Sequence, residues 1–333
     1  MAKFQNMGTF DLNTMQGGSK PFAMDAAGIA SGQAFLTSEL EKRDMLVRTP
    51  LTSFTYTRDI PIRVGGGWAE YVSAMNVGYG ITGGSGDNLI QSASTDGIPL
   101  IQANFGKDLW KTHVISAGTR IFWVDMQRGN MTGRNIDTLL RDGLRMAYDK
   151  HMDENVYAGF AKYGTTGLMN NADVTITSAT GNFSALTPDQ ILADINNAIL
   201  TAWTAAGNDL DAVPNHILLP YAQYNYIATT RVSQIAEKTI LTFLLENNVA
   251  KNYGVDLFIG ATAWCAGAGA GGTDRMVTYC NKERFVAVDE LVPLTRAMTT
   301  PNAERFSYDT AYDGNVSETE VFYPETILYT DGI

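Results

Sequence analysis

The clearest hydrophobic pattern in the chain lies between residues 134 and 159, where apolar side chains recur at the spacing of one helix face. The stripe is formed by Ile136, Leu139, Leu140, Gly143, Leu144 and Ala147, and is continued by His151 or Met152 and by Val156. Charged residues fill the other faces, and Gly159 is a natural stop. The pattern predicts one amphipathic helix, roughly 38 Å long at about 1.5 Å per residue.

Upstream of this helix, short strand-like runs are interrupted by glycines between Gly65 and Gly86. The runs are 54–57, 60–64, 68–72, 109–115 and 119–124. Short polar strands joined by glycines do not enclose a core. The pattern therefore predicts an extended hairpin or loop, with regular strands resuming after residue 108.

A second domain is expected to begin near Thr187, because Thr187 and Gln190 form a capping box with Pro188 at the first helical position. Further helices are expected after Pro220 and after Ser233, the latter with Ile235, Ile240, Phe243 and Leu244 turned inward. The strands expected here are 216–219, 255–259, 275–279, 285–288, 305–308, 320–323 and 327–329. Helices and strands do not alternate as βα units, so the fold class is α+β.

Residues 1–50 show no sustained periodicity apart from a short helix expected at 38–47. A segment this long with little structure is typical of an arm that docks on another molecule. It carries five basic and five acidic residues, without a heptad or a charge run. It is therefore not typical of a DNA-binding tail, and we expect it to act as an arm.

The composition is globular and acidic, with 45% hydrophobic and 18% charged residues and a net charge of −11. This excludes a disordered chain and disfavours a dedicated nucleic-acid-binding protein. The N-terminus lacks a signal peptide, and no apolar run is long enough to span a membrane. Cys265 and Cys280 fit neither a zinc knuckle nor a redox pair, and a disulfide between them is disfavoured in a chain of cytosolic character.

The candidate catalytic and binding motifs each lack part of their pattern. Residues 267–272 contain G-x-G-x-x-G, but a strand is expected after them where a dinucleotide site needs a helix. Residues 83–87 lack the last glycine of a nucleophile elbow. The three histidines are scattered at His113, His151 and His216. Asp149 and Asp153 fit a solvated helix face better than a cation site. We therefore expect no enzyme, no catalytic residue, no cofactor and no metal site.

The long helix is preceded by β-rich sequence and followed by a turn with glycine, then leucine, then asparagine. The residues that carry this pattern are Gly159, Gly164, Gly167, Leu168 and Asn171. This succession resembles the major capsid proteins of tailed bacteriophages, whose fold encapsulin shells also use. The resemblance implies an N-terminal arm (1–57), an extended loop (58–106), a peripheral domain (107–186) with a spine helix (134–159), an axial domain (187–290) and return strands of the peripheral domain (291–333).

The resemblance implies a structural protein that self-assembles into hexamers and pentamers of an icosahedral phage head enclosing double-stranded DNA. The partners implied are further copies, a portal, a separate scaffolding protein and a decoration protein, with packaged DNA nearby but not specifically bound, and no membrane. The location implied is the virion capsid, assembled in the host cytoplasm. The alternatives are an encapsulin-like compartment, for which we identify no cargo site, a two-domain enzyme, and an adhesin built on the β-rich segments.

The extended loop is expected to lie over a neighbouring subunit, and the loop at 260–274 near the axis of each capsomer. The candidate contact residues between subunits are Phe4, Phe10, Phe22, Phe35, Trp68, Tyr71, Trp264 and Cys265. For Trp264, packing on its own domain is an equal alternative. Some relatives join their shells covalently through a lysine of the extended loop. Residues 59–106 contain no lysine and Lys107 lies just beyond them, so we expect a non-covalent shell.

Overall fold

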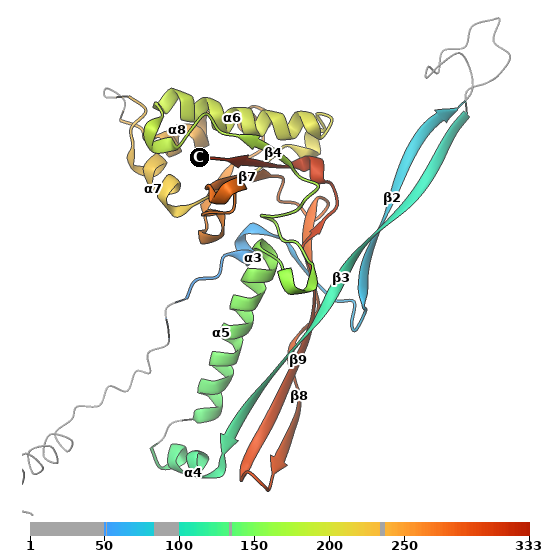
Figure 1. Ribbon diagram of the computed structural model, residues 1–333, viewed down its shortest axis with the longest axis vertical. Helices are drawn as coiled ribbons and strands as arrows, with labels where there is room; N and C mark the ends of the chain where they lie inside the picture. Colours follow the sequence, from blue (N-terminus) through green and yellow to red (C-terminus); the bar gives the residue numbers. More distant parts are fainter. Residues whose placement is uncertain (1–49, 51, 83–99, 133–134, 234–236) are drawn as a thin grey trace, which may run out of the picture. The chain divides into compact units, whose positions relative to one another are not determined.

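The structure of the chain, a computed structural model, describes residues 50, 52–82, 100–132, 135–233 and 237–333. The chain divides into two compact units, Met1–Thr52 and Ser53–Ile333, and all the elements named below belong to the second (Figure 1). None of the helices within the described residues is long and apolar enough to cross a membrane. Helices and strands form an α+β fold, as the sequence predicts.

One sheet is built from long strands in the order β1-β8-β9-β3-β2, with the short strand β10 also paired to β8. The strands are β1 (Ile62–Val64), β2 (Tyr71–Thr82), β3 (Leu100–Phe122), β8 (Val286–Asn302), β9 (Ser307–Ser317) and β10 (Glu320–Val321). The pair β1 and β8 is parallel, and the other pairs are antiparallel. Figure 1 shows β8 and β9 as a long hairpin beside β3.

Strand β3 differs from the two separate strands expected at 109–115 and 119–124. It is one strand of 23 residues, whose first half pairs with β2 and whose second half, from Thr112, pairs with β9. Gly118 does not break it, because the ladder with β9 runs through the Gly118–Ala311 pair. The strand ends at Phe122, and Trp123 begins a helix that the sequence did not predict.

The predicted long helix is confirmed as α5 (Ile136–Tyr157), which is preceded by α3 (Tyr56–Asp59) and α4 (Trp123–Thr132). The side chain of Asn135 caps α5 by accepting a hydrogen bond from the backbone of Asp137 at 3.1 Å. Its C-terminal part, from Tyr148 onward, supplies all of the helix's buried residues. The first half of α5 therefore contributes little to the core of its own chain.

The second sheet has five strands in the order β4-β11-β7-β5-β6. They are β4 (Thr175–Ser178), β5 (His216–Leu219), β6 (Phe258–Ala261), β7 (Arg275–Tyr279) and β11 (Ile327–Asp331). Strand β11 lies between β4 and β7, whereas all of residues 291–333 were expected to return to the other domain. The expectation was wrong for β11. This strand is buried along its whole length, which is typical of a strand at the centre of a covered sheet.

Helices α6 (Pro188–Ala205), α7 (Tyr221–Thr229), α8 (Ile240–Glu246) and α9 (Val249–Asn252) accompany this second sheet. The capping box of α6 is confirmed, with the Gln190 side chain accepting from the backbone of Thr187 at 3.0 Å. Helix α8 starts after Thr239, which caps it, whereas the sequence predicts a start after Ser233. Ile235, expected on its inner face, lies outside the described residues. Short 3-10 helices complete the unit at Ala161–Tyr163, Phe183–Ala185, Leu210–Ala212, Ala263–Cys265, Ala270–Gly272 and Pro324–Thr326.

Two hydrophobic clusters hold these elements together. One packs the end of α5 with β7, β8 and the segment around Tyr56 and Ile60. The other packs α6 with β5, β6 and the helices that follow. Strands β5, β7 and β11 are buried at every position, and for β5 the sequence predicts this burial.

Candidate assembly surface

The ribbon formed by β2 and β3 has one apolar face. In its antiparallel ladder Tyr71 pairs with Lys111 and Ile81 with Ile101, and paired residues point to the same side. The apolar face carries Tyr71, Met75, Val77, Tyr79, Ile81, Ile101, Phe105 and Leu109, interspersed with Ser73, Ala103, Lys107 and Lys111. The opposite face carries mainly small and polar side chains, among them Ala74, Asn76, Gly78, Gly80, Gln102, Asn104, Gly106 and Asp108.

The apolar face of the ribbon is uncovered. Met75 is 75%, Tyr79 78% and Phe105 72% exposed. Contiguous exposed apolar surface of this kind marks an interaction site. A two-stranded ribbon is also marginally stable alone in water. The ribbon therefore has the chemistry of a surface that another molecule covers.

At the root of the ribbon, a groove of about 480 Å³ is lined by Trp68, Glu70, Tyr71, Lys111, Thr112, His113, Val114 and Asn315. Trp68 and Tyr71, two of the predicted contact residues, are exposed here. The Asn315 side chain donates to the backbone oxygens of Gly67 and Ala69 at 3.2 and 3.1 Å. Both aromatic residues are thus presented to solvent from a fixed backbone.

The other predicted contact residues are placed differently. Cys265 is completely buried and lies 3.8 Å from the sulfur of Met169, so the expectation that it contacts another subunit is not met by its position. Trp264 is half-buried, and its indole donates to Asp153 at 2.6 Å and stacks on Tyr157, which agrees with packing on its own chain. Phe4, Phe10, Phe22 and Phe35 lie outside the described residues.

The sequence places Asp153 on a solvated face of the helix, but the structure does not. It is buried and accepts hydrogen bonds from the backbone of Thr55 at 3.0 Å and of Tyr56 at 3.2 Å, besides that from Trp264. Its neighbour one turn earlier, Asp149, accepts from the Tyr56 hydroxyl at 3.2 Å. Position 153 lies next to the apolar stripe of α5, and that was the signal for burial in the sequence. The carboxylate joins the chain before α3 to the spine helix.

Asp59 forms a second buried junction next to it. Its carboxylate accepts two hydrogen bonds from Arg58 and one from the Tyr157 hydroxyl, while its backbone oxygen accepts from Tyr279 at 2.5 Å. Burial by itself raises the pKa of the Asp59 carboxyl. The nearby His216, the Arg58 guanidinium and the Tyr157 hydroxyl outweigh that effect and hold the pKa below its usual range. Asp59 therefore ties α3 to both α5 and β7 as a carboxylate.

The turn after α5 explains the glycines that carry the resemblance. A Cβ on Gly167 would lie 2.4 Å from the carbonyl of Tyr157, and one on Gly159 would lie 2.6 Å from the Thr165 oxygen. Gly159 also has a φ of +69°. The Asn170 side chain closes the turn, accepting from Gly167 and donating to the oxygen of Ala158, each at 2.7 Å.

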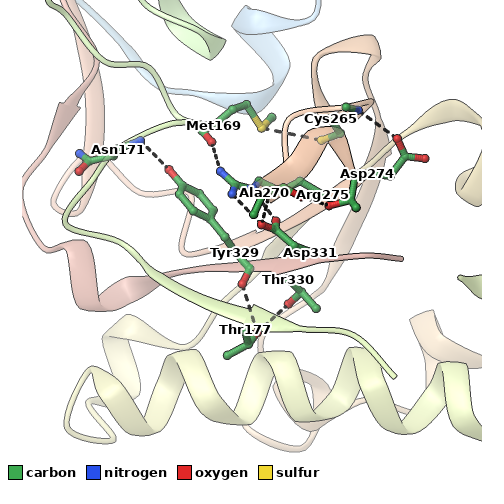
Figure 2. Close-up of polar contacts among 12 residues, drawn as sticks. Met169, Asn171, Thr177, Cys265, Ala270, Asp274, Arg275, Tyr329, Thr330 and Asp331 are labelled. Atoms are coloured by element: carbon green, nitrogen blue, oxygen red, sulfur yellow. Dashed lines mark hydrogen bonds and ion pairs between the residues drawn. The ribbon is translucent and has the colours of Figure 1, made fainter. Parts of the chain in front are cut away.

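This turn is bonded to the second sheet, as Figure 2 shows. The Tyr329 hydroxyl donates to the Leu168 oxygen at 2.6 Å, and Arg275 donates to the Met169 oxygen at 2.6 Å. Arg275 also binds Asp331 through two hydrogen bonds of 2.6 and 2.9 Å and lies over the Tyr329 ring. The end of the spine helix is therefore fixed to β7 and β11 by buried polar contacts.

The structure also places the cysteines and the glycine-rich loop that the sequence offers as candidate sites. No group of three or more His, Cys, Asp and Glu side chains is arranged to hold a metal in the part of the chain that the structure describes. Cys265 and Cys280 are both free and buried, and burial raises the pKa of the Cys280 thiol to about 11. The glycine-rich loop at 267–272 leads into strand β7, as expected, and not into a helix.

The ribbon extends further than the loop expected at 58–106. It reaches Lys111, so Lys107 lies within it, opposite Met75 on the apolar face. Residues 59–106 contain no lysine, but the ribbon is longer than this segment and includes Lys107. The expectation of a non-covalent shell therefore depends on the behaviour of Lys107.

Solved structures similar to this chain come from phage and phage-like capsids. "The capsid of Myoviridae Phage XM1" has a TM-score of 0.76 at 17% identity, with 89% of this chain and 98% of that chain covered. The capsid of a native GTA particle has a TM-score of 0.64 at 10% identity, covering 93% and 99%. A chain from Microbacterium phage Oxtober96 has a TM-score of 0.60 at 13% identity, covering 90% and 98%. At these identities the likeness is one of fold. No curated protein sequence matches the chain.

The resemblance drawn from the sequence is confirmed by a family model described as major capsid protein. The model matches residues 86–333, well over half of the chain. The match includes the spine helix, the turn after it and both strands β7 and β11. The chain belongs to the major capsid protein family, a family of structural shell proteins.

Proposed function

We propose that the protein builds the icosahedral head of a tailed phage by assembling into hexamers and pentamers that enclose double-stranded DNA. The observation that carries the proposal is the exposed apolar face of the β2–β3 ribbon. A neighbouring copy covers this face in the assembled shell. Burial of one large apolar side chain contributes about 1.5–3 kcal/mol, so several of them per subunit stabilise a shell of many copies.

The other parts of the chain have matching roles in this proposal. Residues 1–57 act as an arm on a neighbouring subunit, where Phe4, Phe10, Phe22 and Phe35 dock. Residues 187–290 form the axial domain, with the loop at 260–274 near the capsomer axis. Residues 107–186, with the spine helix, and most of 291–333 form the peripheral domain. Trp68 and Tyr71 contact the next subunit at the root of the ribbon.

The proposal also includes the setting of the shell. The protein assembles in the host cytoplasm with a portal and a separate scaffolding protein, and a decoration protein binds the finished head. Packaged DNA lies nearby without specific binding, which the net charge of −11 supports. The protein works without a cofactor or catalytic residue and is a component of the virion.

The test uses two neighbouring residues on opposite faces of β3. Phe105→Asp places a charge on the apolar face, and Asn104→Asp places the same charge on the other face. Both positions are exposed, so both variants should fold with unchanged circular dichroism. We expect electron microscopy to show closed shells for Asn104→Asp and only capsomers or free subunits for Phe105→Asp. Normal shells from Phe105→Asp would overturn the proposed role of this face.

A deletion of residues 75–95 tests the same proposal more severely. It should leave a folded subunit that does not close a shell, because none of the deleted residues that the structure describes belongs to a core cluster. A compact monomer or dimer from the unaltered chain, at concentrations where capsid proteins assemble, would favour an unrelated activity.

A further inference from the structure

The root of the ribbon contains a cluster of charges around one buried carboxylate, that of Glu320. Strand β1 is followed by Gly65, Gly66 and Gly67, whose φ values are +129°, +114° and +68°, and then by the chain that enters β2. Arg63 of β1 stands two residues before this turn, where β1 pairs with β8. The Arg63 side chain therefore lies at the point where the ribbon joins the main sheet.

The guanidinium of Arg63 is shared by two carboxylates. Its Nε lies 2.5 Å from Oδ1 of Asp289, and its Nη2 binds Oε2 of Glu320. Glu320 is 0% exposed. The same guanidinium lies over the Phe322 ring at 5.4 Å, and Phe322 meets Trp110 of β3 edge to face at 5.0 Å. The charges are thus packed against a residue of the ribbon itself.

The hydrogen bonds around Ser317 can all be satisfied together when Glu320 carries a proton. The Ser317 hydroxyl accepts from the backbone of Asp289 at 2.9 Å and has a single hydrogen to donate. Two acceptors lie within reach of that hydrogen: Oε1 of Glu320 at 2.8 Å and the Glu318 backbone oxygen at 2.9 Å. If Glu320 is protonated at Oε1, it donates to Ser317 and Ser317 donates to Glu318, so both short contacts are satisfied.

We propose that Arg63, Asp289, Ser317 and Glu320 form a proton-operated latch at the root of the ribbon. With a proton on Glu320 the cluster is neutral and fully hydrogen-bonded, and β1 is held against β8 and β10. When the proton leaves to solvent, the buried carboxylate of Glu320 and the partly exposed one of Asp289 share the partly exposed guanidinium of Arg63, with a net charge of −1. The root then opens more readily about the three glycines.

The electrostatics of the site support this assignment. Burial raises the pKa of Glu320 to about 7, and Asp289 adds to the shift, whereas Ser317 and Arg63 oppose it. The charged groups that face Glu320 are Arg63 from β1 and Asp289 from β8, and β9 contributes the uncharged Ser317. Because the folded pKa is raised, the latch is strongest below the unfolded pKa of about 4.3 and weakens as the pH rises through 7.

Hydrogen exchange on assembled particles at pH 6 and pH 8 tests the latch, with each rate corrected for intrinsic exchange. For a carboxyl with a pKa near 7, the factor by which protonation favours the closed root over the open one falls about tenfold from pH 6 to pH 8. We therefore expect peptides covering 62–72 to lose about tenfold in protection in the unaltered protein. In Glu320→Gln, whose amide reproduces the protonated carboxyl, this pH dependence should disappear. Glu325→Gln, at an exposed glutamate nearby, should retain it.

The same pH dependence in Glu320→Gln as in the unaltered protein would overturn the latch, and so would equal protection at pH 6 and pH 8 in the unaltered protein. A second measurement does not depend on the variant folding. Infrared difference spectra of unaltered particles between pH 6 and pH 8 should contain the band of a protonated carboxylic acid that titrates near pH 7. The absence of such a band would also overturn the proposal.

Discussion

The β2–β3 ribbon and the five-stranded sheet are built from strands of similar residue types but differ in what covers them. Strands β5, β7 and β11 are buried at every position, and α6 and its neighbouring helices pack on them. In the ribbon, the first ten residues of β3 are all exposed. The sheet carries the stability of the subunit, whereas the ribbon keeps its apolar surface for contacts outside it. The same kind of side chain therefore has a different energetic role in each region.

The largest effect on the stability of the five-stranded sheet is expected from crowding the turn after α5, which is bonded to β7 and β11. Gly167→Ala would place a methyl group 2.4 Å from the carbonyl of Tyr157, so the backbone has to move. We expect a loss of about 3 kcal/mol or more in the free energy of unfolding, measured by urea denaturation of the unassembled subunit. Gly164→Ala is the control, because its new Cβ meets open space; its positive φ should cost about 1 kcal/mol. Equal losses for the two variants would contradict the close-approach argument.

Two leucines compare the regions directly. Leu218 in β5 is 0% exposed and Leu109 in the ribbon is 57% exposed. Leu218→Ala should lower the free energy of unfolding by about 2–5 kcal/mol, because it leaves a cavity. Leu109→Ala should change it by less than about 0.5 kcal/mol in the free subunit. For the shell we expect the opposite order. The denaturant concentration at which particles release subunits, compared with the concentration at which the free subunit of the same variant unfolds, should fall more in Leu109→Ala than in Leu218→Ala. A large effect of Leu109→Ala on the free subunit would mean that the ribbon packs on its own chain.

The pH dependence of the covered region should come from its buried carboxylates. Burial raises the pKa of Asp331, but Arg275 and the backbone amide of Ala270 outweigh it, so the pKa lies below its usual range. A lowered folded pKa stabilises the protein above the unfolded value of about 3.9 and loses that effect as the pH falls. We expect urea midpoints to fall below about pH 4, less steeply in Asp331→Asn than in the control Asp173→Asn, at an exposed aspartate. Parallel curves for the two variants would contradict the assignment.

The smallest expected effect concerns covalent chemistry on the ribbon. Lys107 lies on the apolar face, and an amine must lose its proton before it attacks an amide. We expect mature particles, boiled in detergent, to give a single band near 36 kDa on a denaturing gel, and Lys107→Arg to change nothing. A ladder of oligomers that disappears in Lys107→Arg would show that the ribbon is cross-linked through this lysine.

The sequence predicted what local periodicity and end signals encode. The spine helix, the capping box of α6 and strand β7 follow from patterns within about twenty residues, and all are confirmed. The second half of β3 pairs with β9, 185 to 205 residues away, and β11 pairs with β4, 153 residues away, and with β7, 48 to 56 residues away. No local pattern specified either pairing. The buried carboxylates of Asp59 and Asp153 were missed because each accepts a hydrogen bond from a side chain about a hundred residues away, Tyr157 for Asp59 and Trp264 for Asp153.

For the assembly surface, the sequence indicated the segment but not its faces. Trp68 and Tyr71 are exposed as a contact role requires, because they lie where the ribbon leaves the sheet. Cys265 was misjudged because a glycine-rich neighbourhood suggested a surface loop, whereas its side chain turns inward toward Met169. The apolar face became visible only with the register between β2 and β3, which pairs residues across the gap in the described chain.

The continuity of β3 restricts how the length of this segment can change during evolution. Residues 100–111 set the two faces of the ribbon, and residues 112–122 set the pairing with β9, along one uninterrupted pleat. Inserting or deleting a single residue near position 112 would turn the ribbon over relative to the sheet, because side chains alternate with a period of two. Length variation among descendants of this gene should therefore occur in steps of two residues along the strand, or be absorbed by a bulge.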